Sequence, residues 1–172
     1  MAAKPALWAD VRRDLHVARS HVAKAAVRAR MLDRRGKSLP DDVRIDREYA
    51  IAVMLHHAYG AMESALERLI RAVDGDLPTG VSYHAEIIRR AATPIEGVRS
   101  AIITQSTASG LHRLRSFRHA FRHAYYDYDH ARAAENVPVA VQVARSFTAE
   151  LSAFAKAINL TTSKPAGREE RD

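Results

Sequence analysis

Apolar residues recur along most of the chain at the three- and four-residue spacing of an α-helix. Between Pro5 and Gly36 they alternate strictly in steps of three and four, which predicts one long helix with a single apolar seam. Three of the eight seam positions are alanines, whose small side chains permit close antiparallel packing against a second helix. The seam consists of Trp8, Val11, Leu15, Ala18, Val22, Ala25, Ala29 and Leu32.

The same spacing, interrupted at the prolines, predicts four further helices. Asp41 and Asp42 offer an N-cap for the second helix, because aspartate side chains accept hydrogen bonds from the free amides of a first turn. Its apolar positions continue until Gly75 and Pro78, which end it. The remaining helices are predicted over residues 83–92, 104–126 and 136–158.

No segment alternates between apolar and polar residues for long enough to predict a strand. The sequence therefore predicts an all-α, up-and-down bundle of four long helices and one short helix. We expect residues 1–160 to form a single domain. Residues 161–172 are polar, lack an apolar face and are predicted to be a disordered tail.

Composition agrees with a helical protein and narrows its chemistry. The chain has 172 residues, among them 32 alanines and no cysteine, which excludes disulfides, thiolate metal sites and cysteine nucleophiles. Its net charge of +7 favours polyanionic partners, although a general preference for arginine also explains part of that charge. We expect no signal peptide and no membrane span, and therefore a cytoplasmic location.

The helix predicted over 104–126 has an unusual polar face. Leu114, Phe117 and Phe121 fall on its apolar side, and no acidic residue occurs from Ser106 through Tyr126. Neighbouring cations one turn apart repel each other, so this face is suited to an anionic ligand. The cationic and imidazole side chains on it are His112, Arg115, Arg118, His119, Arg122 and His123.

Arginine and histidine together suit the cleavage of a phosphate ester without a metal. Arginine supplies a permanent charge and a fork of donors for phosphoryl oxygens, and histidine moves protons near neutral pH. Proton transfer from a ribose 2′-hydroxyl would make RNA the substrate. Arg118 and His123 project about 140° apart on one helix, so a cleft between two copies of the helix accommodates both more easily.

At these residues the chain resembles the HepT-like ribonuclease toxins of the HEPN superfamily, found in toxin–antitoxin modules. Their signature begins with an arginine, which is usually followed by a polar residue. Four to six residues in all separate this arginine from a histidine, and a tyrosine lies two places after the histidine. Arg118, His119, His123 and Tyr125 follow this arrangement. Similar stretches occur at 61–70, 74–78 and 93–99, and the likeness extends over about residues 49–158.

The resemblance implies a HEPN-like helical homodimer that acts as a metal-independent endoribonuclease, without a cofactor, in a type VII-like toxin–antitoxin system. Arg118 and His123 would be catalytic, with His119 as a third catalytic residue that supports them, and Glu63 would orient the arginine. Tyr125 would be the residue to which a nucleotidyltransferase antitoxin transfers AMP. The remaining basic side chains of the face would contact RNA, namely His112, Arg115 and Arg122.

Plainer interpretations stay open at this point. The bundle could be catalytically inactive and bind RNA, a nucleotide or a nucleotidyltransferase partner through the same face. Tyr125 lies towards the apolar side and could simply pack, and Glu63 could be a buried acid bonded to a neighbouring tyrosine or arginine. His119, His123 and Asp127 have a spacing that can hold a metal, but the adjacent arginines would repel a cation.

Overall fold

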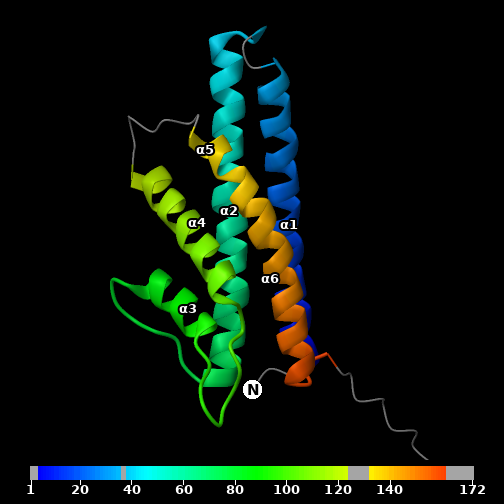
Figure 1. Ribbon diagram of the computed structural model, residues 1–172, viewed down its shortest axis with the longest axis vertical. Coiled ribbons are helices and arrows are strands. Elements are labelled where there is room, and N and C mark those ends of the chain that lie inside the picture. The colour runs from blue at the N-terminus through cyan, green and yellow to red at the C-terminus, as the bar shows by residue number, and fades with distance from the viewer. Residues whose placement is uncertain (1–3, 36–37, 124–131, 162–172) are drawn as a thin grey trace, which may run out of the picture.

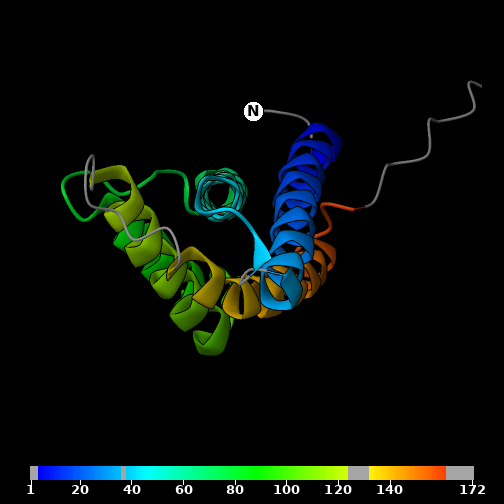
Figure 2. The same ribbon diagram turned by 90° about the horizontal axis from the view of Figure 1, so that it is seen from above.

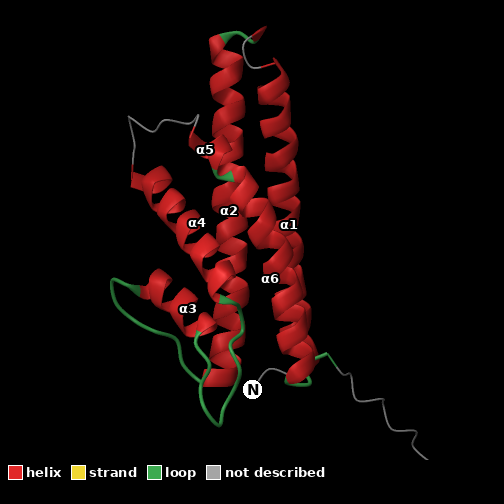
Figure 3. Cartoon of the chain, viewed as in Figure 1, coloured by secondary structure: helices red, strands yellow, loops and turns green. Residues whose placement is uncertain are grey.

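The structure, a computed structural model, describes residues 4–35, 38–123 and 132–161. Over these residues the chain is built from helices joined by loops, and no strand is present in the described ranges (Figures 1 and 3). The helices are α1 (Lys4–Arg35), α2 (Asp41–Asp74), α3 (Tyr83–Ala92), α4 (Gln105–His123), α5 (Arg132–Glu135) and α6 (Val137–Ala157).

α2 is the central helix of the bundle. Seen from above, α1 and α6 lie to one side of α2, and α3 and α4 lie to the other (Figure 2). α1 and α2 run antiparallel, and the seam predicted along α1 faces the core: its positions from Val11 to Ala29 are buried, and Trp8 and Leu32 pack at its two ends. This arrangement confirms the predicted all-α bundle.

The start of α2 differs from the prediction. Pro40, not an aspartate, occupies the N-cap position, and no side chain caps the helix. Asp41 and Asp42 lie inside the first turn, where their charges complement the positive end of the helix dipole. The predicted end is confirmed, since Gly75 follows the last residue with a φ of 93°, a conformation that favours glycine.

A buried ion pair fixes the lower end of α2 to the loop between α3 and α4. Arg99 donates to both carboxylate oxygens of Asp74, from Nε at 2.6 Å and from Nη2 at 2.8 Å. The same guanidinium donates to the carbonyl oxygens of Arg90, Thr93 and Ser100. Because almost all of its donors are used, this buried charge is well compensated and holds the loop that leads into α4.

α4 begins at a capped end that is anchored on α6. The hydroxyl of Thr104 accepts a hydrogen bond from the Thr107 amide at 3.3 Å, which satisfies one free donor of the first turn. The carboxylate of Glu150 accepts from the Thr104 amide at 3.0 Å and from the Thr107 hydroxyl at 2.9 Å. These contacts set the direction in which α4 leaves the loop.

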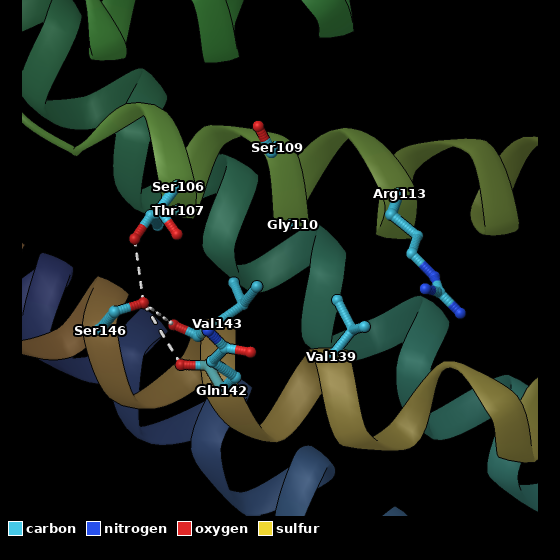
Figure 4. Close-up of a pocket in the computed structure, with 9 residues that line it drawn as sticks. All are labelled: Ser106, Thr107, Ser109, Gly110, Arg113, Val139, Gln142, Val143 and Ser146. Atoms are coloured by element: carbon cyan, nitrogen blue, oxygen red, sulfur yellow. Dashed lines mark hydrogen bonds between the residues drawn. The ribbon is translucent and has the colours of Figure 1, made fainter.

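Further along, α4 and α6 touch at a glycine. A surface groove of about 260 Å³ separates the two helices, and Gly110, Val139 and Val143 lie at its floor (Figure 4). A Cβ atom added to Gly110 would collide with the Cγ2 methyl of Val143. Glycine is therefore needed here for close approach of the helices, although it is a poor helix former.

Gly110→Ala is expected to lower the free energy of unfolding by about 1–3 kcal/mol, because overpacking at this contact outweighs the gain in helix propensity. Urea unfolding of the wild type and the variant measures this change. A second substitution, Val143→Ala, removes the colliding methyl group and should recover part of the loss that Gly110→Ala causes. An unchanged or raised stability of Gly110→Ala would contradict the close contact.

The remaining helix boundaries follow the predictions with two differences. α3 spans residues 83–92 as predicted, and α6 begins one residue after Asn136, with Pro138 in its first turn. The short helix α5 was not predicted, since four residues carry no periodic signal. The predicted end of α4 at Tyr126 lies outside the described residues. So do residues 162–172 of the tail that is predicted over 161–172.

Candidate functional site

α4 sorts its side chains largely as its sequence predicts. Leu111, Leu114 and Phe117 are buried against the core, and Phe121 is half-buried. On the basic face, the fully exposed residues lie in the last turns of the helix. They are His119, Arg122 and His123, whereas His112 and Arg115 are half-buried.

Arg118 is less exposed than its place on the basic face of α4 predicts. Its side chain is only 17% exposed and turns from α4 towards α2, where its guanidinium lies over the ring of Tyr59 at 5.4 Å. The reason is geometric, because Arg118 is one turn beyond Leu114 and one residue beyond Phe117, on the border of the apolar side. A guanidinium over an aromatic face gains a cation–π interaction that offsets part of the desolvation.

The partner of Arg118 is Glu63, a buried glutamate of α2. Arg118 Nη1 donates to Glu63 Oε2 at 3.2 Å, and the hydroxyl of Tyr59 donates to Oε1 at 3.0 Å. His84 of α3 brings its Nδ1 to the same Oε1 at 2.7 Å, and since a carboxylate only accepts, Nδ1 carries the proton. One carboxylate therefore ties α2, α3 and α4 together through three donors.

Tyr59 is fixed in its protonated form within this cluster. Burial, followed by the negative charge of Glu63, raises the pKa of Tyr59 far above its ordinary value. The phenol therefore remains a hydrogen-bond donor to Glu63 at any physiological pH. It orients the carboxylate that in turn receives the guanidinium of Arg118.

His119 and His123 form a second group on the outer side of α4. They are one helical turn apart, both are exposed, and their ring centroids are separated by 4.4 Å. Within one chain the structure thus joins Arg118 to Glu63 and His119 to His123, as two groups that face different directions. The predicted divergence of about 140° between Arg118 and His123 agrees with this arrangement.

A further set of histidines lies where α1, α2 and α4 meet. His21 of α1 is close to His57, with ring centroids at 5.3 Å, and His56 contacts Phe121 at 5.7 Å. Burial lowers the pKa of His21 and His56, and the positive charges of His57 and Arg118 lower them further. Burial also lowers the pKa of His112 on α4. These three imidazoles are neutral near pH 7.

The free energy of unfolding is expected to fall as the pH drops below about 6.5, the unperturbed histidine pKa. In that range the unfolded chain binds protons at His21, His56 and His112 before the folded chain does, so acid favours unfolding. Urea unfolding at about pH 7 and about pH 5.5 measures the loss. A His21→Gln/His56→Gln variant should lose less stability over the same interval, and an equal loss would contradict the role of these histidines.

Two residues of the cluster were not singled out by the sequence. Tyr59 precedes Glu63 by one turn on the same helix, a spacing that places the two side chains together and could have indicated the contact. His84 comes from a different helix, and no local pattern connects it with Glu63. Tyr125 and Asp127 lie outside the described residues, and the described residues contain no group of three or more metal-ligating side chains.

Glu63→Gln is expected to lower the free energy of unfolding by about 1–3 kcal/mol, because the largely buried guanidinium of Arg118 loses its counter-charge and His84 loses an anionic hydrogen-bond acceptor. Glu67→Gln is the matched control: it lies one turn further along α2, and only the hydroxyl of Tyr83 is seen to donate to it, at 2.8 Å. Thermal or urea unfolding of both variants gives the comparison. A loss for Glu67→Gln equal to that for Glu63→Gln would show that the Arg118 contact adds nothing.

The fold and the site together define an all-α bundle in which a cationic, histidine-bearing helix packs on a buried glutamate. A family model described as "HepT-like protein" matches residues 50–158, which is more than half of the chain. The chain therefore belongs to the HepT-like family, a branch of the HEPN ribonuclease superfamily. Neither the curated proteins nor the solved structures gave a match.

The matched region contains residues 50–74 of α2 and the whole of α3, α4, α5 and α6, and so includes every member of the Glu63 cluster and the histidine pair. α1 lies outside it. Among the described helices, none is long and apolar enough to cross a membrane.

Proposed function

We propose that this HepT-like protein is a metal-independent endoribonuclease toxin that acts as a homodimer. The observation that carries the proposal is made on α4. Arg118 of this helix is held by Glu63 of α2, and the exposed pair of His119 and His123 lies on the same helix as Arg118. A positioned guanidinium and accessible imidazoles are the groups that cleave RNA without a metal. Membership of the HepT-like family supports the same activity.

The chemistry assigns each side chain a role. A histidine, His123, accepts the proton of a ribose 2′-hydroxyl as its oxygen attacks the adjacent phosphorus atom. The bond from phosphorus to the 5′-oxygen breaks, a protonated imidazole returns a proton to that oxygen, and a 2′,3′-cyclic phosphate remains. His119 either is the imidazole that donates this proton or supports the histidine that does. The guanidinium of Arg118 stabilises the extra negative charge on the phosphoryl oxygens in the transition state.

Arg118 keeps donors for such a phosphoryl group. Glu63 engages Nη1, and Nε is buried without a hydrogen-bond partner among the described residues. Buried donors are normally satisfied, so the unpaired Nε shows that the guanidinium is incompletely bonded within the described residues; a phosphoryl group reaches this nitrogen only when the side chain turns outward. Glu63 thus orients the guanidinium without occupying all of it.

A dimer resolves the separation between Arg118 and His123. On one helix they face different directions, whereas a second copy of α4 can present its histidines to the first copy's arginine. The neighbouring surface of α2 supports a contact there, because Ile45 is 46% exposed and Tyr49, 51% exposed, packs on Phe121. Apolar side chains exposed beside a site are typical of an interface.

The wider proposal follows the family. His112, Arg115 and Arg122 extend the cationic face along α4 and would hold the RNA backbone. A nucleotidyltransferase antitoxin, in a type VII-like pair, would silence the toxin by transferring AMP to Tyr125. Adding a charged nucleotide two residues beyond His123 would block the face electrostatically and sterically.

Incubation of the purified protein with single-stranded RNA and with transfer RNA in excess EDTA tests the activity. We expect cleavage that chelation does not diminish. Cleavage that disappears in EDTA, or that persists undiminished in both Arg118→Ala and His123→Ala, would overturn the proposal.

One observation favours a second candidate, an inactive bundle that binds RNA, a nucleotide or a nucleotidyltransferase. Arg118 is half-buried and engaged by Glu63, as expected of a purely structural ion pair. Such a protein would bind RNA in a salt-sensitive manner and cleave none between about pH 5 and pH 9. Copurification with AMP or ATP would favour the nucleotide-binding form.

A further inference from the structure

A cationic groove is lined by residues of α1 and α6. α1 lies on the opposite side of α2 from α3 and α4 (Figure 2). The groove has a volume of about 530 Å³. Arg12, His16 and Arg19 line it from α1 at successive helical turns, and Thr148 and Ser152 line it from α6. Trp8 lies at its end, about 17 Å along the helix axis from Arg19.

The groove is cationic because the acidic residues of α1 turn the other way. Asp10 and Asp14 pair with Arg68 of α2, at 3.5 Å and 2.8 Å, and no carboxylate lines the groove. Asp10 also pairs at 3.4 Å with Arg13, a further lining residue, so the unpaired charge of the groove comes from its other arginines. Arg12 and Arg19 are exposed, and neither forms an ion pair within the described part of the chain. Unpaired cations in a concave surface concentrate anions there.

The tryptophan gives the groove a second kind of contact. Trp8 is half-buried, with one side packed against the core, so its indole has little freedom of movement. A fixed aromatic ring beside spaced arginines is the combination by which proteins hold single-stranded nucleic acid, with phosphates on the cations and a base stacked on the ring. An acidic protein segment would use the arginines but would gain little from the indole.

The position of the groove separates it from the family's signature. All of its α1 side chains lie outside residues 50–158, the range that the HepT-like family model matches. The Glu63 cluster joins α2, α3 and α4, and none of these helices lines the groove. The residues proposed for cleavage therefore leave this groove unexplained.

We propose that the groove between α1 and α6 is a second binding site for single-stranded RNA, in which Arg12, His16 and Arg19 hold phosphates and Trp8 stacks on a base. It would retain a stretch of the substrate outside the cleavage site. The choice of RNA over another polyanion rests on the proposed function, whereas the charge and the stacking surface are properties of the groove itself.

The test measures binding of a fluorescently labelled oligouridylate by anisotropy in the Arg118→Ala background, so that cleavage does not interfere. Arg12→Gln/Arg19→Gln should weaken binding and should reduce the slope of log affinity against log salt by about 0.7 for each charge removed. Trp8→Leu, which keeps an apolar contact with the core, should weaken binding about 5- to 100-fold. The matched control, Arg34→Gln/Arg35→Gln, removes the same charge from the far end of α1 and should bind like its parent.

A second readout uses Trp8 directly. It is the only tryptophan in the chain, so oligouridylate should quench the protein's tryptophan fluorescence, and polyglutamate of equal charge should not. Circular dichroism and the melting temperature show whether each variant is folded. The proposal is overturned if Arg12→Gln/Arg19→Gln binds like the control, if Trp8→Leu changes nothing, or if polyglutamate competes as well as RNA.

The outcomes separate this proposal from the proposed activity. If the wild type binds RNA through the groove but cleaves none, the proposed ribonuclease activity is contradicted and the proposed binding site is upheld. If the wild type cleaves RNA and the groove variants bind RNA normally, the proposed activity is upheld and the proposed binding site is contradicted.

Discussion

Arg118→Ala is expected to lower the rate constant for RNA cleavage by about 10²–10³, the cost of removing one donor that stabilises charge in a transition state. The loss should appear in kcat under single-turnover conditions, because the guanidinium is matched to the charge that develops on the phosphoryl oxygens. Arg122→Ala is the comparison variant on the same face. It is fully exposed, and its loss should weaken RNA binding far more than it lowers kcat.

Arg118→Ala also strips Glu63 of its counter-charge, so the folded fraction of the variant needs to be known. Arg118→Lys addresses this directly. It keeps a positive charge near Glu63 but loses the planar fork of donors. We expect the lysine variant to be nearly as stable as the wild type and still strongly impaired in cleavage. A lysine variant with full activity would contradict a role for the guanidinium in the transition state.

His123→Ala is expected to lower the cleavage rate by about 10²–10⁴, the usual contribution of a positioned general acid or base. His123 is exposed, and within the described residues its ring contacts the ring of His119. The substitution should therefore leave the free energy of unfolding almost unchanged. The pH dependence of kcat gives a second measure, since loss of one titrating group removes one limb of a bell-shaped profile. His112→Ala, further back on α4, is the comparison: it is expected to weaken RNA binding and to leave the pH profile of kcat unchanged, because His112 holds RNA and transfers no proton.

A rate for His123→Ala close to that of the wild type, with an unaltered pH profile, would remove His123 from the mechanism. If His119→Ala then abolished activity, the two histidines would have exchanged roles.

The helices could be predicted from the sequence because their signals are local and repeated. The strict seam of α1 from Val11 to Ala29 is buried as predicted, and α3 spans its predicted residues. The errors fall where few residues carry the signal. The cap of α2 is Pro40 although aspartates follow it, and α5 is too short for periodicity to reveal it.

The candidate site was only partly predictable, because its contacts join helices that are distant in sequence. The apolar and basic sides of α4 followed from helical spacing. The contact of Arg118 with Glu63 is expected both if Glu63 orients the arginine and if it is a buried acid bonded to a tyrosine or an arginine. The half-buried position of Arg118 depends on Tyr59 and α2, which α4 alone does not encode. His84 reaches Glu63 only through the packing of α3.

The central claim is that Arg118 of one protomer and His123 of its partner cleave RNA together through attack by the 2′-hydroxyl. Coexpression of Arg118→Ala and His123→Ala chains with different tags, followed by purification on both tags, yields dimers in which one of two sites keeps both side chains. In EDTA, these mixed dimers should generate 2′,3′-cyclic phosphate ends at about half the wild-type rate, although each parent variant is nearly inactive. Mixed dimers as inactive as the parents, or products with 3′-hydroxyl ends, would contradict the account.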